Sequence, residues 1–507
     1  MTIDTANVPS LDPGESYVAH ATCDQFTNID PDHPTDWEYD FVVKAQVNAV
    51  ANETTTDDNS VWYPDDDVVS YDEEHDSDSF TDTFDPQPMT FYSLDDGWPS
   101  VPSPTILSDS LGNYNTPVVL ADLDNDGEDE IIVRTSSGYL SVFTGDGSTV
   151  SGWPKYIGTS SIIPSVGDID TDSNLEIVCY GDEKVRAFNH NGSTVLGWST
   201  PLTKTINTDI VVANLNGTGK DEIIFGAGTY LYAYNGNRAP YSSWTDGLTP
   251  GRLEVTSGSE RVQSISVTNL DQSSASLEVL YHCTTTSLTH YYGCYDASGS
   301  LLFSKSNLPE GLAFTYSLDV GGDNDQETFY KTGASGHQLQ AWDSDGIVYE
   351  DFTATTDENQ TIRTDIVHGT IGSDDDEVEV IAVIAVDGQI NAWNLDGFRE
   401  FDVGDLPKMW PPLIAAVDNT DGPDLVGVYF DGTVQAFDYD GDIIEEYTFT
   451  IHDSGIKMGA IGNIDDDDEA EFVFVAGDKV IALELEGLAS DIQWGQYRHD
   501  ASHDNAD

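Results

Sequence analysis

The feature that most constrains the fold of this chain is a repeat. A strand-like segment ends in an aromatic or large apolar residue, and glycine follows four positions later. Seven copies place that residue at Phe143, Phe188, Tyr295, Trp342, Trp393, Phe437 and Leu483, and a degenerate copy places it at Tyr234. Successive copies lie 45, 46, 61, 47, 51, 44 and 46 residues apart. Similarity at such a period is typical of repeat architectures.

A second pattern accompanies the first: an acidic loop that runs directly into an apolar strand. It reads DLDNDGEDEIIV at 122–133, DIDTDSNLEIV at 168–178 and NIDDDDEAEFVFV at 463–475. Each unit then holds four short strands: one before the acidic loop, one after it, the aromatic strand, and an outer strand marked by Gly-Trp-Pro at 152–154. Four strands in roughly 40–50 residues are typical of a propeller blade.

We therefore predict an all-β protein with an eight-bladed β-propeller at residues 89–507. Seven blades are the alternative if the irregular fourth unit, at about 245–305, is an insertion. An additional Gly-Trp-Pro at 97–99 precedes the first acidic loop, so Trp98 is expected to complete the last blade. The segment around Trp494 competes for that place. For residues 1–88, which lack the repeat, we predict a small β-sandwich or arm used for anchoring or assembly, with a long loop in the polar stretch 52–78.

The charge of the chain bounds its partners. Acidic side chains number 92 against 18 basic ones, and the formal net charge is -74. Such a surface repels nucleic acid and anionic membranes, so neither is an expected partner. Apolar residues still make up 38%, which favours a folded protein. In molar salt, where the Debye length is about 3 Å, the repulsion is screened. We interpret the charge as halophilic adaptation, with a calcium-loaded mesophilic protein as the alternative.

The acidic loops have the spacing of a cation site. Oxygen ligands at alternating positions suit Ca²⁺, which binds six to eight of them at about 2.3–2.6 Å. Positions one, three, five and nine are the candidate ligands. They are Asp122, Asp124, Asp126 and Glu130 in the first loop, Asp168, Asp170, Asp172 and Glu176 in the second, Asp319, Asp323 and Glu327 in the fifth, and Asn463, Asp465, Asp467 and Glu471 in the last. The third loop, with Asn214, Asn216 and Thr218, is low in charge and is expected to be weak or empty. Solvated acidic turns are the competing explanation.

These motifs together resemble FG-GAP/VCBS-type repeats, which form calcium-binding β-propellers such as the head of integrin α chains. The resemblance covers about residues 98–497. It implies that positions one, three, five and nine ligate calcium through side chains and that position seven, Glu128 in the first loop, contributes its backbone carbonyl. The loops of this chain end in Glu where integrin-type loops usually end in Asp. Several structural Ca²⁺ sites are the implied cofactors, with Mg²⁺ or Na⁺ in the weaker loops.

Function follows less directly from the sequence. The sequence contains no nucleophile elbow, phosphate loop or spaced histidine cluster, so we do not expect an enzyme. A polysaccharide-active enzyme is the least favoured of the functions considered. The first residues lack the basic start and apolar core of an export signal. We therefore expect a virion surface protein, a spike, turret or tail fibre of a haloarchaeal virus, acting in host attachment or structural decoration. The alternative is a secreted or cell-surface haloarchaeal adhesion protein.

The expected partners follow from that hypothesis. They are other virion proteins through the N-terminal domain and a host cell-surface protein or glycan through a propeller face, in an oligomeric assembly without membrane insertion. Four cysteines do not form a disulfide framework. Cys283 and Cys294 could form a bridge or remain free thiols.

Overall fold

The computed structural model describes residues 44–46, 60–62 and 116–498. The last range has gaps at 171, 256–259, 271–275, 286–289, 309–312, 321, 323–325, 333–335, 357–359, 364–365, 374–376, 404–409, 419–421, 431–432, 451–458, 466, 477–478 and 497. The chain divides into two compact units, Met1–Asp85 and Pro86–Asp507.

In the first unit, the described residues form one antiparallel pair, β1 (Lys44–Gln46) with β2 (Ser60–Trp62). β2 falls in the stretch 52–78, for which the sequence predicts a long loop, and that prediction is wrong at this position. The Ser-Val-Trp segment contains the β-branched and aromatic residues that strands favour. The predicted β-sandwich otherwise lies outside the described residues.

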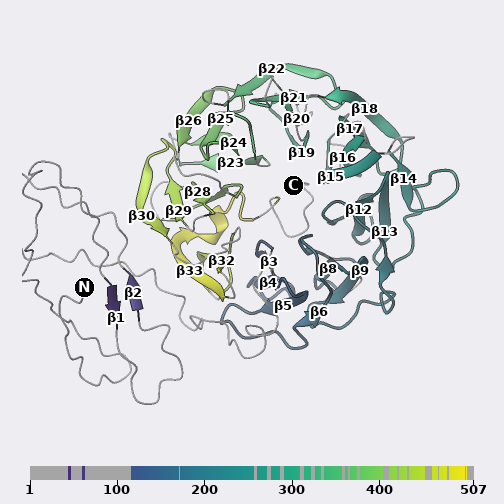
Figure 1. The fold of residues 1–507 in the computed structure, drawn as a ribbon, viewed down its shortest axis with the longest axis horizontal. Helices are drawn as coiled ribbons and strands as arrows, with labels where there is room; N and C mark the ends of the chain where they lie inside the picture. The colour runs from purple at the N-terminus through teal and green to yellow at the C-terminus, as the bar shows by residue number, and fades with distance from the viewer. Residues whose placement is uncertain are drawn as a thin grey trace, which may run out of the picture. The chain divides into compact units, whose positions relative to one another are not determined.

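The second unit is an eight-bladed β-propeller (Figure 1), so the eight-blade prediction is confirmed. Blade 1 consists of β3 (Val119–Ala121), β4 (Glu130–Arg134), β5 (Tyr139–Phe143) and β6 (Lys155–Tyr156), and blade 2 of β7 (Ser165–Gly167), β8 (Glu176–Gly181), β9 (Lys184–Asn189) and β10 (Leu202–Thr203). Blade 3 consists of β11 (Val211–Ala213), β12 (Glu222–Ala227), β13 (Tyr230–Asn235) and β14 (Arg252–Glu254). Blade 4 consists of β15 (Glu260–Thr268), β16 (Glu278–Thr285), β17 (His290–Tyr295) and β18 (Leu301–Leu308).

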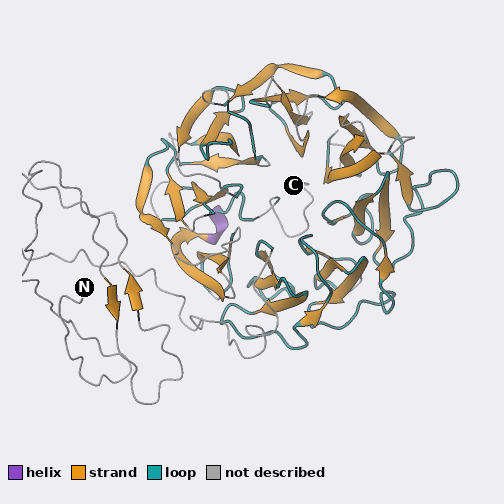
Figure 2. Cartoon of the chain, in the orientation of Figure 1, coloured by secondary structure: helices purple, strands orange, loops and turns teal. Residues whose placement is uncertain are grey.

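Blade 5 consists of β19 (Ala313–Leu318), β20 (Glu327–Thr332), β21 (Gln338–Trp342) and β22 (Val348–Thr355), and blade 6 of β23 (Val367–Ile371), β24 (Val378–Ile384), β25 (Ile390–Asn394) and β26 (Arg399–Val403). Blade 7 consists of β27 (Leu413–Ala415), β28 (Asp424–Val428), β29 (Thr433–Phe437) and β30 (Ile443–Thr450). Blade 8 consists of β31 (Ala460–Gly462), β32 (Glu469–Ala476) and β33 (Lys479–Leu488). A short 3₁₀ helix, η3 (Ala489–Asp491), follows β33. Strands account for most of the described regular structure (Figure 2).

Within each blade the strands pair antiparallel in chain order, and the first strand lies nearest the ring axis (Figure 1). The predicted order of strands around the acidic loop is therefore correct. The irregular fourth unit is a full blade rather than an insertion, because β15 to β18 pair as one four-stranded sheet. Its extra length lies partly in β15 and β16, which are longer than β11 and β12 of blade 3. Among the described residues blade 8 has three strands, and Trp98, expected to supply a fourth, lies outside them.

The strand after each acidic loop is apolar because both of its faces are buried. All five residues of β4 are buried. Alternate side chains point to opposite faces of a strand, and in β4 those faces meet different blades. Ile131 packs in a cluster with Val473 of blade 8, whereas Ile132 packs in a cluster with Ile177 of blade 2. The core of this ring thus lies between blades.

The described cysteines, Cys179, Cys283 and Cys294, are free and buried. Of the two possibilities left by the sequence for Cys283 and Cys294, free thiols are correct. Their strand registers explain the result, because Cys283 pairs with Tyr291 and Cys294 with Leu280 across β16 and β17. Among the described residues, no helix has the length and apolar character needed to cross a membrane.

Candidate metal centre

In blades 1 to 5, 7 and 8, the acid at position nine, or its equivalent, closes the loop on itself. One carboxylate oxygen accepts a hydrogen bond from the backbone N–H of the residue at position two, or its equivalent. The pairs are Leu123 with Glu130 at 2.9 Å, Ile169 with Glu176 at 3.1 Å, Leu215 with Glu222 at 3.1 Å, Leu270 with Glu278 at 2.8 Å, Val320 with Glu327 at 3.1 Å, Val417 with Asp424 at 3.1 Å and Ile464 with Glu471 at 2.8 Å. This hydrogen bond holds the carboxylate beside the turn without the help of a cation.

Three loops bring their acids together into groups that could hold a cation. In each group one carboxylate oxygen per residue lies within 4.8 Å of the others. The groups are Asp122, Asp124 and Glu130 in blade 1, Asp168, Asp170 and Glu176 in blade 2, and Asp465, Asp467 and Glu471 in blade 8. These are the three loops with the clearest alternation of acids in the sequence. Donor sets made only of oxygen suit hard cations such as Ca²⁺ and Mg²⁺.

The group in blade 2 has the strongest need for a cation. Glu176 is fully buried, and its Oε1 has no hydrogen-bond partner; the same is true of the buried Oδ1 of Asp168. Burial, together with the charges of Asp170, Asp172 and Asp168, raises the pKa of Glu176 to about 8. Buried carboxylate oxygens without a donor are costly unless a cation or proton meets them. The other oxygen of Asp168 forms an ion pair with Lys220 of blade 3.

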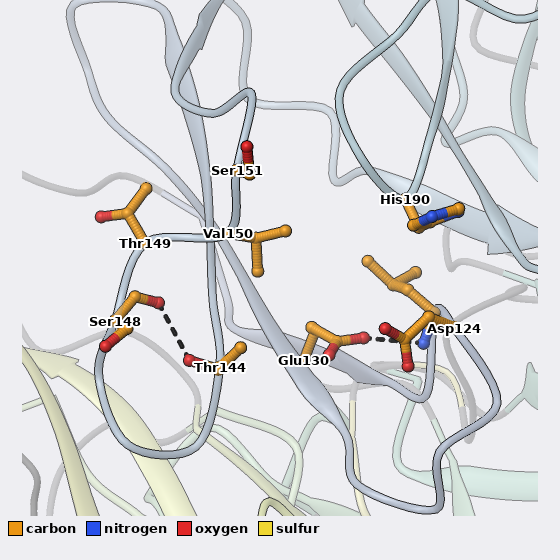
Figure 3. Close-up of a pocket in the computed structure, with 9 residues that line it drawn as sticks. Asp124, Glu130, Thr144, Ser148, Thr149, Val150, Ser151 and His190 are labelled. Atoms are coloured by element: carbon orange, nitrogen blue, oxygen red, sulfur yellow. Dashed lines mark hydrogen bonds between the residues drawn. The ribbon is translucent and has the colours of Figure 1, made fainter.

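The group in blade 1 opens onto a cavity of about 230 Å³ (Figure 3). Burial is the main reason that the pKa of Glu130 rises to about 7, and the charges of Asp124, Asp126 and Asp122 add to the effect. Burial and the neighbouring Asp126 and Asp122 also raise the pKa of Asp124, while His190 of blade 2 opposes the shift. The cavity is lined by Leu123, Asp124, Glu130, Thr144, Ser148, Thr149, Val150, Ser151 and His190.

Several predicted ligands lie outside the three groups and bond to the backbone instead. Asp126 Oδ1 accepts the N–H of Glu128 at 3.0 Å, and Asp172 Oδ1 accepts the N–H of Asn174 at 3.1 Å. The side chain of Asn463 accepts the N–H of Asp465 and donates to the carbonyl of Asp467. These contacts are typical of Asx turns, and the metal role of the Glu128 carbonyl stays a prediction.

The fifth loop is described only in part. Asp319 Oδ1 accepts the N–H of Gly322 at 2.6 Å, and Glu327 accepts the N–H of Val320. The third predicted ligand, Asp323, lies outside the described residues.

The third loop satisfies its acid without a cation. Glu222 Oε2 accepts the N–H of Leu215, and its Oε1 accepts the side-chain amide of Asn216 at 3.4 Å. An amide donor therefore occupies a position where the other loops present carboxylates. This arrangement gives a physical reason for the expectation that the third loop is weak or empty.

Sequence reasoning missed some of the acids that matter in these loops. Glu278 and Asp424 are the loop-closing acids of blades 4 and 7. In blade 4 one extra residue separates the acid from its N–H donor, whereas in blade 7 the spacing from Val417 to the acid is unchanged but Ala416 occupies position one. Asp467 also lies in a second group, with Glu469 and Glu484. Glu484 belongs to β33, and only the pairing of Glu471 with Glu484 across β32 and β33 brings that strand to the loop. No local sequence signal marks it.

One family model matches part of the propeller. The model of the FG-GAP-like repeat family matches residues 122–179, which run from the first acidic loop into β8. No curated protein is detectably similar in sequence.

Solved structures of similar fold include BamB from Moraxella catarrhalis, with a TM-score of 0.45 and 15% identity over 73% of this chain and 97% of that one. The biofilm matrix protein Bap1 of V. cholerae has a TM-score of 0.39 and 13% identity over 76% and 92%. The C-terminal WD40 domain of Sif2 has a TM-score of 0.41 and 11% identity over 74% and 97%.

Proposed function

We propose that this β-propeller with an FG-GAP-like repeat is a non-enzymatic recognition or structural module stabilised by Ca²⁺ in its acidic loops. The observation that carries the proposal is the blade 2 group, where two buried carboxylate oxygens, Asp168 Oδ1 and Glu176 Oε1, have no partner. The matching groups in blades 1 and 8 support it. A cation there would neutralise clustered carboxylates and join the loop to the buried second strand.

The stabilising effect of such a cation follows from mass action. A ligand that binds only the folded state stabilises it by about 2.7 kcal/mol per site at a free concentration of 100 times Kd. The loops also contact one another: Leu175 N–H of blade 2 donates to Leu123 O of blade 1 at 2.9 Å, and Asp129 N–H of blade 1 donates to Asn463 O of blade 8 at 2.6 Å. A cation that orders one loop is therefore expected to stabilise the junction with the next blade as well.

A pair of matched variants tests the proposal. Glu176→Gln removes a charged ligand from a group with unpartnered oxygens, whereas Glu222→Gln alters the acid of a loop that already satisfies itself. Elemental analysis and calorimetry at constant molar ionic strength should find bound Ca²⁺ in the unmodified protein. About one equivalent should be lost in Glu176→Gln and none in Glu222→Gln.

Removal of Ca²⁺ by a chelator at constant ionic strength should lower Tm. An unchanged melting curve together with no bound Ca²⁺ would contradict the proposal.

The biological setting that we propose is the surface of a virion in a hypersaline environment, as a spike, turret or tail fibre. The net charge of -74 supports a molar-salt environment, and a rigid ring with loops at its faces suits binding of a host protein or glycan. The N-terminal unit would hold the protein in its assembly.

Fractionation separates this setting from a cell-surface adhesion role. Mass spectrometry should find the chain in purified virions, and its presence only in the envelope of uninfected cells would support the alternative. Release of sugars from host polysaccharide by the purified chain would contradict the non-enzymatic assignment.

A further inference from the structure

The segment that follows η3 runs along the ring axis beside the innermost strands. Trp494 forms an antiparallel bridge with Ile414 of β27 in blade 7, with hydrogen bonds of 3.0 and 2.8 Å in the two directions. Ile461 N–H of β31 in blade 8 donates to Gly495 O at 2.7 Å. The sequence left open whether the Trp494 segment forms the outer strand of the last blade. The structure places it instead at the opposite, axial side of the blades.

The next residue joins this segment to the first blade. The side-chain amide of Gln496 pairs with both backbone groups of Leu120 in β3: Leu120 N–H donates to Oε1 at 3.1 Å, and Nε2 donates to Leu120 O at 3.0 Å. The amide thus bonds to β3 much as a neighbouring strand would. Three consecutive residues, Trp494 to Gln496, therefore contact blades 7, 8 and 1, which flank the junction between the end and the start of the ring.

The same segment extends across the axis to other blades. The Trp494 side chain is 3% exposed, and its ring packs edge-on against Tyr316 of β19 with centroids 5.2 Å apart. Arg498 Nη1 donates to Ile265 O of β15 at 2.9 Å, and Arg498 Nη2 lies 3.8 Å from Asp209 Oδ2 of blade 3. An aromatic ring and a guanidinium therefore occupy the axis, where the inner strands of blades 3, 4 and 5 converge.

We infer that residues 492–496 and 498, the axial clasp, close the ring from its inner side by fastening blades 7 and 8 to blade 1. An innermost strand has backbone N–H and C=O groups that no further strand of its own blade can pair. The clasp satisfies both groups of Ile414 and of Leu120 and the N–H of Ile461. The clasp also places Trp494 and Arg498 on the inner side of the ring, against β19 and β15. The inference is independent of metal binding.

Hydrogen exchange in the full-length Gln496→Ala variant tests the clasp. The Leu120 amide donates directly to the removed side chain, so its exchange should accelerate roughly five- to tenfold, as expected for loss of one partly buried hydrogen bond. The amides of β7 in blade 2, which lies away from the junction of blades 8 and 1, should keep their rates. Gln435→Ala, at a half-buried glutamine in β29, serves as the matched control and should leave Leu120 unchanged. Unaltered Leu120 exchange in Gln496→Ala would overturn the inference.

Truncation gives a second, independent readout. A chain that ends after Asp491 should melt at a lower temperature and exchange faster at Ile414 and Ile461, whereas a chain that ends after Arg498 should match the full protein. Equal Tm and exchange in the two truncated chains would contradict the clasp. If the shorter chain does not fold, the Leu120 exchange rate in Gln496→Ala still tests the clasp.

Discussion

Buried tryptophans precede the outer strands of blades 1, 2 and 3, and two of them bond to the next blade. Trp153 Nε1 of blade 1 donates to the carbonyl of His190 in the hairpin of blade 2, and Trp198 Nε1 of blade 2 donates to the carbonyl of Gly236 in the hairpin of blade 3. Trp244 of blade 3 is likewise fully buried, but its Nε1 has no hydrogen-bond partner. The indole N–H therefore contributes at two of these three positions.

This difference gives a matched prediction for two tryptophans. Trp198→Phe should destabilise the protein by about 1–2 kcal/mol more than Trp244→Phe, because only the first substitution removes a hydrogen bond and leaves a buried carbonyl without its donor. Both substitutions remove the same volume from a buried site. Chemical denaturation monitored by far-UV circular dichroism measures the difference, and equal losses would contradict this role of the indole N–H.

The buried loop acids predict the dependence of stability on pH. The pKa values of Glu130 and Glu176 are raised from 4.5 to about 7 and about 8. A group whose pKa is higher in the folded state favours folding while it is protonated, so its contribution is complete below about pH 4.5 and is lost as pH rises through about 7 to 8. The Tm of calcium-depleted protein should therefore fall as pH rises from about 4.5 to about 8.

The proposed Ca²⁺ binding predicts the opposite trend, because a cation that binds these loops would favour the ionised carboxylates. The difference in Tm between calcium-loaded and calcium-depleted protein should increase from about pH 5 to about pH 8.5. Scanning calorimetry at fixed ionic strength measures both curves. A difference in Tm that stays constant with pH would show that these acids are not the ligands.

At the scale of the element, the hairpin of one blade rests on the acidic loop of the blade before it. A Cβ added to Gly236 of blade 3 would lie 1.5 Å from Ile169 O of blade 2, and one added to Gly145 of blade 1 would lie 1.7 Å from Ile464 O of blade 8. Neither glycine has a positive φ. Glycine is thus required here by the close approach of two backbones.

Alanine substitutions at two glycines of blade 3 distinguish the effect of a close backbone approach from the effect of a positive φ. Gly236→Ala should cost about 3 kcal/mol or more, because backbone atoms must move to admit the methyl group. Gly228→Ala, also in blade 3, has open space and a φ of 60°, so it should cost only about 1 kcal/mol. Thermal melts of the two variants test the comparison, and similar losses would contradict the tight junction.

The two sequence patterns predicted the elements well because each reports a local requirement. The apolar run after each acidic loop reports burial on both faces, as in β4, and the Asp-Gly and Asn-Gly turns report the positive φ of a hairpin, as at Gly147 and Gly192. The convergence of Glu484 on Asp467 and the axial course of Trp494 depend on contacts between distant segments. Neither leaves a periodic trace in the sequence.

At the scale of the whole molecule, charge sets the conditions under which the ring is stable. The net charge is -74, and the Debye length grows from about 3 Å at 1 M salt to about 10 Å at 0.1 M. Repulsion between carboxylates on neighbouring loops is then no longer screened, and it opposes the compact state.

Transfer from molar salt to about 0.1 M salt should therefore lower Tm. Millimolar Ca²⁺ should restore part of the loss, and an equal increment of ionic strength from NaCl should restore less. Melting curves in about 0.1 M salt alone, with added Ca²⁺ and with added NaCl measure the two recoveries. Equal recovery by the two salts would indicate general screening in place of specific binding.

The alternating burial of Ile131 and Ile132 has a consequence for how such a ring can change over generations. Each unit supplies half of two separate cores and completes neither alone. Loss or gain of one unit would bring together two surfaces that had never been in contact, while the same chain must still close a circle. Variation is therefore expected to accumulate in the exposed loops long before the number of units changes.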